Sequence, residues 1–80
     1  MKLKKNIAIS ESGFVFNPNT GDSFSVNPIG SLILGLLQDG KSERSIKGAI
    51  AKAYEVGNDQ LEEDFYDFTS HLKQLNLFNK

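Results

Sequence analysis

The chain has 80 residues, a length that allows one small domain with a modest hydrophobic core. With 39% hydrophobic residues, six Phe and two Tyr, its composition is that of a packed protein rather than a disordered one. A formal net charge of −1 argues against a protein whose main task is to neutralise phosphates, and the absence of cysteine excludes disulfides and thiolate metal sites. The longest apolar stretch covers only residues 32–37, so we expect neither a signal peptide nor a membrane span, and a cytoplasmic location.

Three short runs in the first third of the chain alternate in side-chain type with a period of two, which predicts half-buried β-strands. The expected strands cover about residues 5–10, 14–18 and 22–27. Turn residues separate them, with Ser12-Gly13 in the first gap and Pro18 to Asp22 in the second. We therefore expect a three-stranded antiparallel meander.

Apolar side chains at intervals of three and four residues predict three helices in the rest of the chain. These helices are expected at about residues 28–39, 42–56 and 59–75. Capping side chains and glycines mark their ends: Asn27-Pro28 and Gly40 for the first, Ser42 and Gly57 for the second, Asp59 and Asn76 for the third. Gly35, inside the first helix, predicts a close approach of its backbone to a neighbouring element.

The order of the predicted elements, three strands and then three helices, indicates an α+β fold that is winged-helix-like in outline. We expect a single domain over residues 1–80, in which the three-stranded antiparallel sheet covers one side of the three helices.

Side chains that could carry out catalysis are few. His71 is the only histidine, and a single histidine on a long helix is most often a solvated side chain. The acidic side chains of the third helix lack the alternating oxygen ligands and central glycine of a calcium loop: Asp59, Glu62, Glu63, Asp64 and Asp67. The sequence therefore predicts no enzyme activity, no cofactor and no metal site.

Charge is distributed unevenly along the helices. Residues 41–57 carry a net positive charge and residues 58–80 a net negative one. A nucleic-acid-binding winged helix that uses residues 42–55, Lys47 among them, is therefore one alternative. It is the weaker one, because the basic residues are few and the acidic third helix would repel a phosphate backbone.

The third predicted strand offers a different kind of binding site. The segment Asp22 to Val26 has small, uncharged side chains at Ser23 and Ser25, and contains neither Pro nor Lys to hinder pairing. An edge strand of this kind can accept an added strand from a peptide. Two alternatives remain open: a loop or the N-terminal segment covers the edge, or two copies of the chain pair their edges in a homodimer.

Short motifs follow one another in a characteristic order over about residues 7–78. They are Asn17-Pro18, Gly21, Val26 to Gly30, Leu36 to Gly40, Ser45-Ile46, Ala49-Ile50, Tyr54 to Val56, Glu62 to Phe65, and then Phe68, Leu72, Leu75 and Leu77. In order and spacing this set resembles the PqqD-like proteins, which are recognition elements of ribosomally made, post-translationally modified peptides.

This resemblance implies that a precursor's leader peptide adds as a strand beside the third strand, in a groove whose other wall is the third helix. The chain would present the precursor to a modifying enzyme, commonly a radical-SAM maturase, and would catalyse no step itself. The expected peptide-binding residues are Asp22, Ser23, Phe24, Ser25, Val26, Leu61, Phe65, Phe68, Thr69 and Leu72. Either flank of the third helix could face the strand: one carries Glu62, Tyr66, Thr69 and Lys73, the other Asp64, Asp67 and His71.

Overall fold

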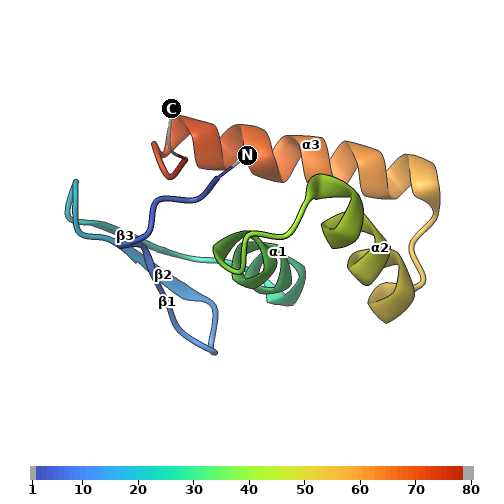
Figure 1. Cartoon of the computed structure of the whole chain (residues 1–80), viewed down its shortest axis with the longest axis horizontal. Coiled ribbons are helices and arrows are strands. Elements are labelled where there is room, and N and C mark those ends of the chain that lie inside the picture. Colours follow the sequence, from blue (N-terminus) through green and yellow to red (C-terminus); the bar gives the residue numbers. More distant parts are fainter. Residues whose placement is uncertain (1, 79–80) are drawn as a thin grey trace.

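A computed structural model of the chain describes residues 2–78. Its elements are β1 (Ala8–Ile9), β2 (Phe14–Asn17), β3 (Asp22–Ser25), α1 (Pro28–Gln38), α2 (Glu43–Tyr54) and α3 (Asn58–Gln74). In Figure 1 the long helix α3 crosses the molecule, with the sheet near its C-terminal end and α2 near its N-terminal end. The predicted α+β arrangement of three strands followed by three helices is confirmed.

The three strands form an antiparallel sheet in the order β1-β2-β3, as the meander prediction requires. Gly13 and Gly21, in the two connections, have φ values of +88° and +79°, which glycine adopts without strain. β1 is shorter than the predicted residues 5–10, because a turn at residues 5 and 6 precedes it. Before that turn, the chain pairs with its own C-terminal end, where Lys4 N donates to Leu77 O at 2.8 Å.

The two faces of the sheet differ sharply in burial. Val15 and Asn17 on β2 are buried, whereas Phe14 and Phe16 are 48% and 39% exposed. The register places Phe24 opposite Val15, so Phe24 lies on the inner face and packs against the core. The outer face therefore carries two exposed phenylalanines beside the serines of β3.

The helix ends follow the predicted capping chemistry except between α2 and α3. Asn27 Oδ1 accepts a hydrogen bond from Gly30 N at 2.8 Å, and Ser42 Oγ accepts one from Ser45 N at 3.2 Å. Gly57 does not end α2, which ends at Tyr54 with Glu55 in the left-handed conformation. Gly57 is the N-cap of α3 instead, so the prediction of an Asp59 cap is wrong.

This earlier end of α2 has a packing reason. Val56, between the two helices, is partly buried against the core, so the chain must turn before it. At the other end of α3, Asn76 adopts the predicted left-handed conformation with φ +62°, and Leu77 turns back into the core. The buried core side chains are Leu3, Ile7, Val15, Ile33, Leu34, Leu37, Ile46, Ile50, Leu61, Phe65, Leu72 and Leu77.

Candidate functional site

The free edge of β3 presents the backbone groups of its two serines. Val26 N donates to Gly13 O at 2.8 Å, and successive residues of an antiparallel strand direct their backbone groups to opposite sides. Phe24 therefore bonds toward β2, and the N–H and C=O groups of Ser23 and Ser25 point to the open side. The bond from Ser10 N to Phe14 O gives the same alternation across β2.

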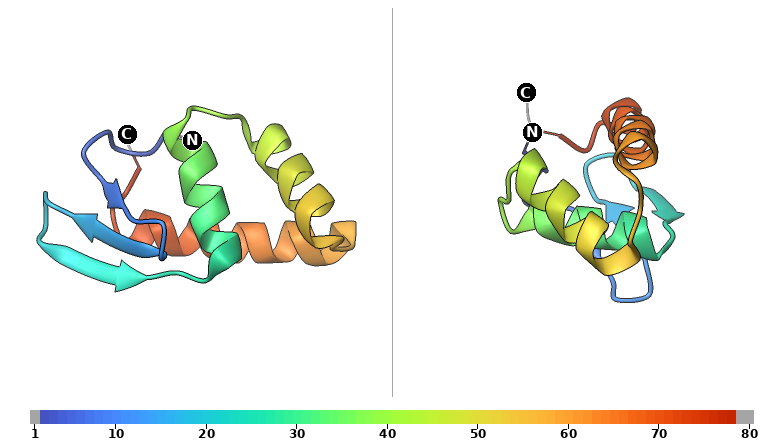
Figure 2. Two further views of the ribbon diagram at one scale, coloured as in Figure 1. Left: turned by 90° about the horizontal axis from the view of Figure 1, so that it is seen from below. Right: turned by 90° about the vertical axis from the view of Figure 1, so that its right-hand side faces the viewer.

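No segment among residues 2–78 pairs with this edge. β3 is the last strand of the sheet, as Figure 2 shows, and both serine side chains are exposed. The N-terminal segment is one candidate to cover the edge, but it pairs elsewhere: Leu3 forms an antiparallel bridge with Phe78. The edge is thus available for strand addition.

A pocket of about 410 Å³ opens close to the end of this strand, between α1 and α3. Its floor is apolar, and four of the floor side chains belong to the buried core: Ile33, Ile50, Leu61 and Phe65. Its remaining lining residues are Asn27, Ile29, Gly30, Val56, Asp64, Asp67, Phe68 and His71. The volume and the apolar floor fit a site that receives a large apolar group.

Gly30 links the pocket to the strand. A Cβ atom at this position would lie 3.0 Å from Phe68 Cε1 and 3.0 Å from Val26 Cβ, so glycine lets α1 begin between them without crowding either side chain. The close approach predicted for Gly35 is wrong, because no neighbouring atom would come within 4 Å of a Cβ there. The glycine with the packing role is therefore five residues earlier, just after the helix cap.

The predicted α3 residues divide into two groups. Leu61, Phe65 and Phe68 line the pocket, whereas Thr69 and Leu72 are buried and do not line it. The Thr69 hydroxyl donates to the carbonyl of Phe65 at 2.9 Å, which satisfies it within the helix. Of the two flanks of α3, the one that carries Asp64, Asp67 and His71 lines the pocket.

The contribution of α1 to the pocket is not among the features predicted from the sequence. Ile29, Gly30 and Ile33 form one wall, and Val56 comes from the α2–α3 connection. The motif Asn27-Pro28-Ile29-Gly30 could have indicated this wall. It starts a helix directly after an edge strand, so the first turn of that helix must lie at the end of the strand. The apolar periodicity of α1 assigned its side chains to the core instead.

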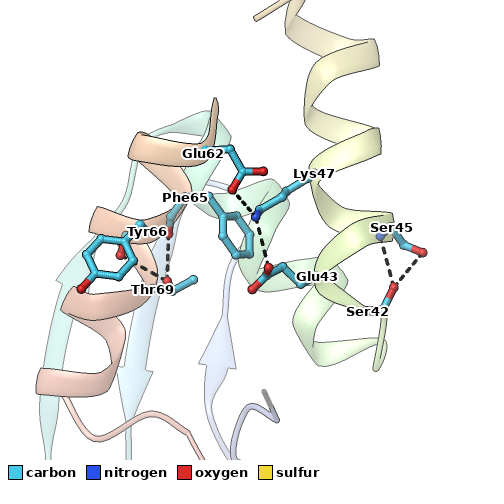
Figure 3. Close-up of polar contacts among 8 residues, drawn as sticks. All are labelled: Ser42, Glu43, Ser45, Lys47, Glu62, Phe65, Tyr66 and Thr69. Atoms are coloured by element: carbon cyan, nitrogen blue, oxygen red, sulfur yellow. Dashed lines mark hydrogen bonds and ion pairs between the residues drawn. The ribbon is translucent and has the colours of Figure 1, made fainter. Parts of the chain in front are cut away.

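Lys47 on α2 makes the two ion pairs of the described part of the chain (Figure 3). Its Nζ lies 2.6 Å from a carboxylate oxygen of Glu62 on α3 and 3.1 Å from one of Glu43, and 5.0 Å from the centre of the Phe65 ring. The hydrogen bond to Glu62 raises the pKa of Lys47 above its usual 10.5; burial opposes this rise, and Glu43 adds to it. With two carboxylates already bound, this lysine is a poor phosphate ligand.

Across residues 2–78, no three His, Cys, Asp or Glu side chains gather in a way that could hold a metal ion. None of the helices within this range has the length and apolar character needed to cross a bilayer.

Comparison with known proteins gives one family and two solved structures. The family described as coenzyme PQQ synthesis protein D (PqqD) matches residues 13–77. A chain described as TbiB1 in complex with the TbiA(beta) leader peptide is 29% identical, with a TM-score of 0.87 over 99% of this chain and 95% of that one. Lasso peptide synthetase B1 complexed with the leader peptide is 22% identical, with a TM-score of 0.81 over 99% and 96%, and supports the fold alone. No curated protein sequence matches.

Proposed function

The chain belongs to the PqqD family, and from this membership we propose that it is a non-catalytic adaptor that binds the leader segment of a ribosomally made precursor peptide. The similar TbiB1 chain is described in complex with a leader peptide, which supports the proposal. The observation that carries it is the open edge of β3, where Ser23 and Ser25 direct outward backbone groups that no segment of residues 2–78 pairs with, beside an apolar pocket.

In the proposed complex the peptide extends the sheet by one strand. Its backbone pairs with Ser23 and Ser25, and the side chain opposite Phe24 points to the inner face, because side chains alternate between the faces. Beyond Val26 the peptide reaches the pocket at Asn27. The entropy lost when a flexible peptide becomes ordered offsets much of the energy gained from its contacts, so we expect a Kd of about 0.1–10 μM.

The proposed peptide-binding residues remain those of the sequence prediction on β3 and α3. Asp22 to Val26 would pair with the peptide, and Leu61, Phe65 and Phe68 would contact it from the pocket. Thr69 and Leu72 would act from the core, where they support the groove rather than line it. Ile29 and Gly30 on α1 join the proposed set.

The adaptor would act together with a modifying enzyme. We propose a radical-SAM maturase as that enzyme, on the family resemblance, and a cytoplasmic location for the pair. The adaptor would itself need no cofactor and catalyse no step, since its contribution is to hold the precursor. Its small size and its open edge suit such a role in presenting a peptide to a larger protein.

The nucleic-acid alternative loses support from the surroundings of Lys47. The most central basic side chain of residues 42–55 is held by Glu43 and Glu62, and a phosphate would have to displace both carboxylates. The homodimer alternative uses the same β3 edge as the peptide. It predicts a dimer by sedimentation that dissociates when the peptide is added.

The test of the proposal starts with an affinity capture. Tagged protein is passed through lysate of the native host, and bound material is identified by mass spectrometry down to small-peptide size. A recovered peptide is then synthesised and titrated against wild type, Ser25→Pro and Ser25→Ala. Proline removes the outward N–H of Ser25 whereas alanine keeps it, so the pair isolates one backbone hydrogen bond.

We expect Ser25→Pro to weaken binding about tenfold and Ser25→Ala to leave it unchanged, because one backbone bond and the pairing around it are lost. Circular dichroism confirms that both variants are folded. Equal affinity in wild type and Ser25→Pro would exclude the β3 edge as the binding site. Retention of duplex DNA, with no peptide, would favour the nucleic-acid alternative.

A further inference from the structure

We infer that the peptide segment that enters the α1–α3 pocket carries a large apolar side chain next to a lysine or arginine. This inference rests on the proposed function and adds a charge specificity to it. It follows from two properties of one pocket: an apolar floor, and a rim whose two aspartates form no ion pair within residues 2–78.

The floor of the pocket selects for an apolar group. Buried side chains from three helices converge there, Ile33 from α1, Ile50 from α2 and Phe65 from α3. None of these side chains offers a hydrogen bond, so a polar group placed among them would lose its water without replacement. An apolar side chain that enters the pocket gains from the area removed from water.

The rim of the pocket selects for a positive charge. Asp64 and Asp67 lie one turn apart on the same flank of α3, and both are exposed. Asp64 accepts a hydrogen bond from Gln60 Nε2 at 2.9 Å, and this neutral donor does not balance the carboxylate charge. The ion pairs found within residues 2–78 both use Lys47, and no Lys or Arg of that range lines the pocket.

Lysine and arginine fit this combination of floor and rim better than a small cation does. Their aliphatic stems can lie over the half-buried ring of Phe68 while the charged ends reach Asp64 or Asp67. An acidic side chain at the same place would face two like charges, so the rim also rejects acidic peptides. His71 completes the rim and can exchange hydrogen bonds with the peptide backbone.

The test uses displayed random dodecapeptides, selected on wild type, on the double variant Asp64→Asn/Asp67→Asn and on Glu63→Gln. Glu63 is an exposed acidic residue of α3 that does not line the pocket. Glu63→Gln therefore removes a negative charge from the same helix outside the pocket and serves as the control. We expect the wild-type and Glu63→Gln pools to be rich in Lys or Arg beside a large apolar residue. The double variant should keep the apolar preference and lose the basic one.

A basic peptide from the wild-type pool should bind the double variant roughly tenfold more weakly at low salt, and the difference should shrink at high salt. Equal loss in Glu63→Gln would show a general charge effect and overturn the inference. Selected peptides that bind Ser25→Pro more weakly than wild type, but are not enriched in Lys or Arg, would also overturn the inference. They would leave the proposed function intact. An empty selection, or pools that bind Ser25→Pro as tightly as wild type, would contradict the proposed function and this inference together.

Discussion

Gly30, in the first turn of α1, lies directly against the ring of Phe68 on α3. A Cβ at Gly30 would stand 3.0 Å from Phe68 Cε1 on one side and 3.0 Å from Val26 Cβ on the other. The contact holds the end of the edge strand, the start of α1 and the middle of α3 at one point. Gly30 and Phe68 both line the pocket, so this contact lies between the pocket and the end of the open strand.

Gly30→Ala is therefore expected to destabilise the fold by roughly 1 kcal/mol, because overpacking outweighs the gain in helix propensity. The Phe68 ring can shift, but Val26 Cβ is fixed to the backbone and cannot. Gly35→Ala is the matched control: it lies in the same helix with open space around it, and should stabilise by about 0.5–1 kcal/mol. Urea unfolding measures both, and stabilisation by both variants would contradict the packing argument.

The Lys47–Glu62 pair predicts a stability difference that depends on pH. The pKa of Lys47 is raised in the folded state, so the pair stabilises the fold fully below the unfolded-state pKa of about 10.5. This contribution is lost as the pH rises through the raised value. Lys47→Met keeps an apolar stem against Phe65 and should lower the Tm at neutral pH, with the deficit disappearing in strong alkali.

Lys41→Met serves as the control for that experiment. Lys41 lies in the α1–α2 connection, is exposed, and takes no part in the ion pairs of residues 2–78. Its replacement should change the Tm little, and by the same amount at both pH values. A deficit of Lys47→Met that persists in strong alkali would show that packing, rather than charge, links α2 to α3.

Local capping and strand patterns carried much of the fold prediction. Asn27 and Ser42 cap the helices that they were expected to cap, because their side chains bond to amides only three residues ahead. The edge position of β3 followed from a meander of three strands with short turns. These features depend on residues that are close together in the sequence, so local sequence patterns are enough to predict them.

The pocket and the orientation of the sheet depend on tertiary packing instead. The flank of α3 that faces the pocket is set by how α1 packs, and no local pattern in α3 distinguishes Asp64 from Glu62. In the same way, a period of two shows that β2 has two faces without showing which is buried. Asn17 takes the inner face beside Val15, with its Oδ1 bound to the amide of Asn19 at 3.0 Å.

Because of the orientation of β2, we expect replacement of the smaller residue Val15 to cost more stability than replacement of the larger residue Phe14. Val15 is completely buried, so Val15→Ala should leave a cavity and cost about 2–3 kcal/mol. Phe14, the larger residue next to it, is 48% exposed on the outer face, and Phe14→Thr keeps a good strand former there at a cost below about 1 kcal/mol. Urea unfolding of the two variants, compared at equal m-value, measures this contrast. A larger loss in Phe14→Thr than in Val15→Ala would mean that the outer face of the sheet is covered in solution, as it would be if two copies of the chain associated through it.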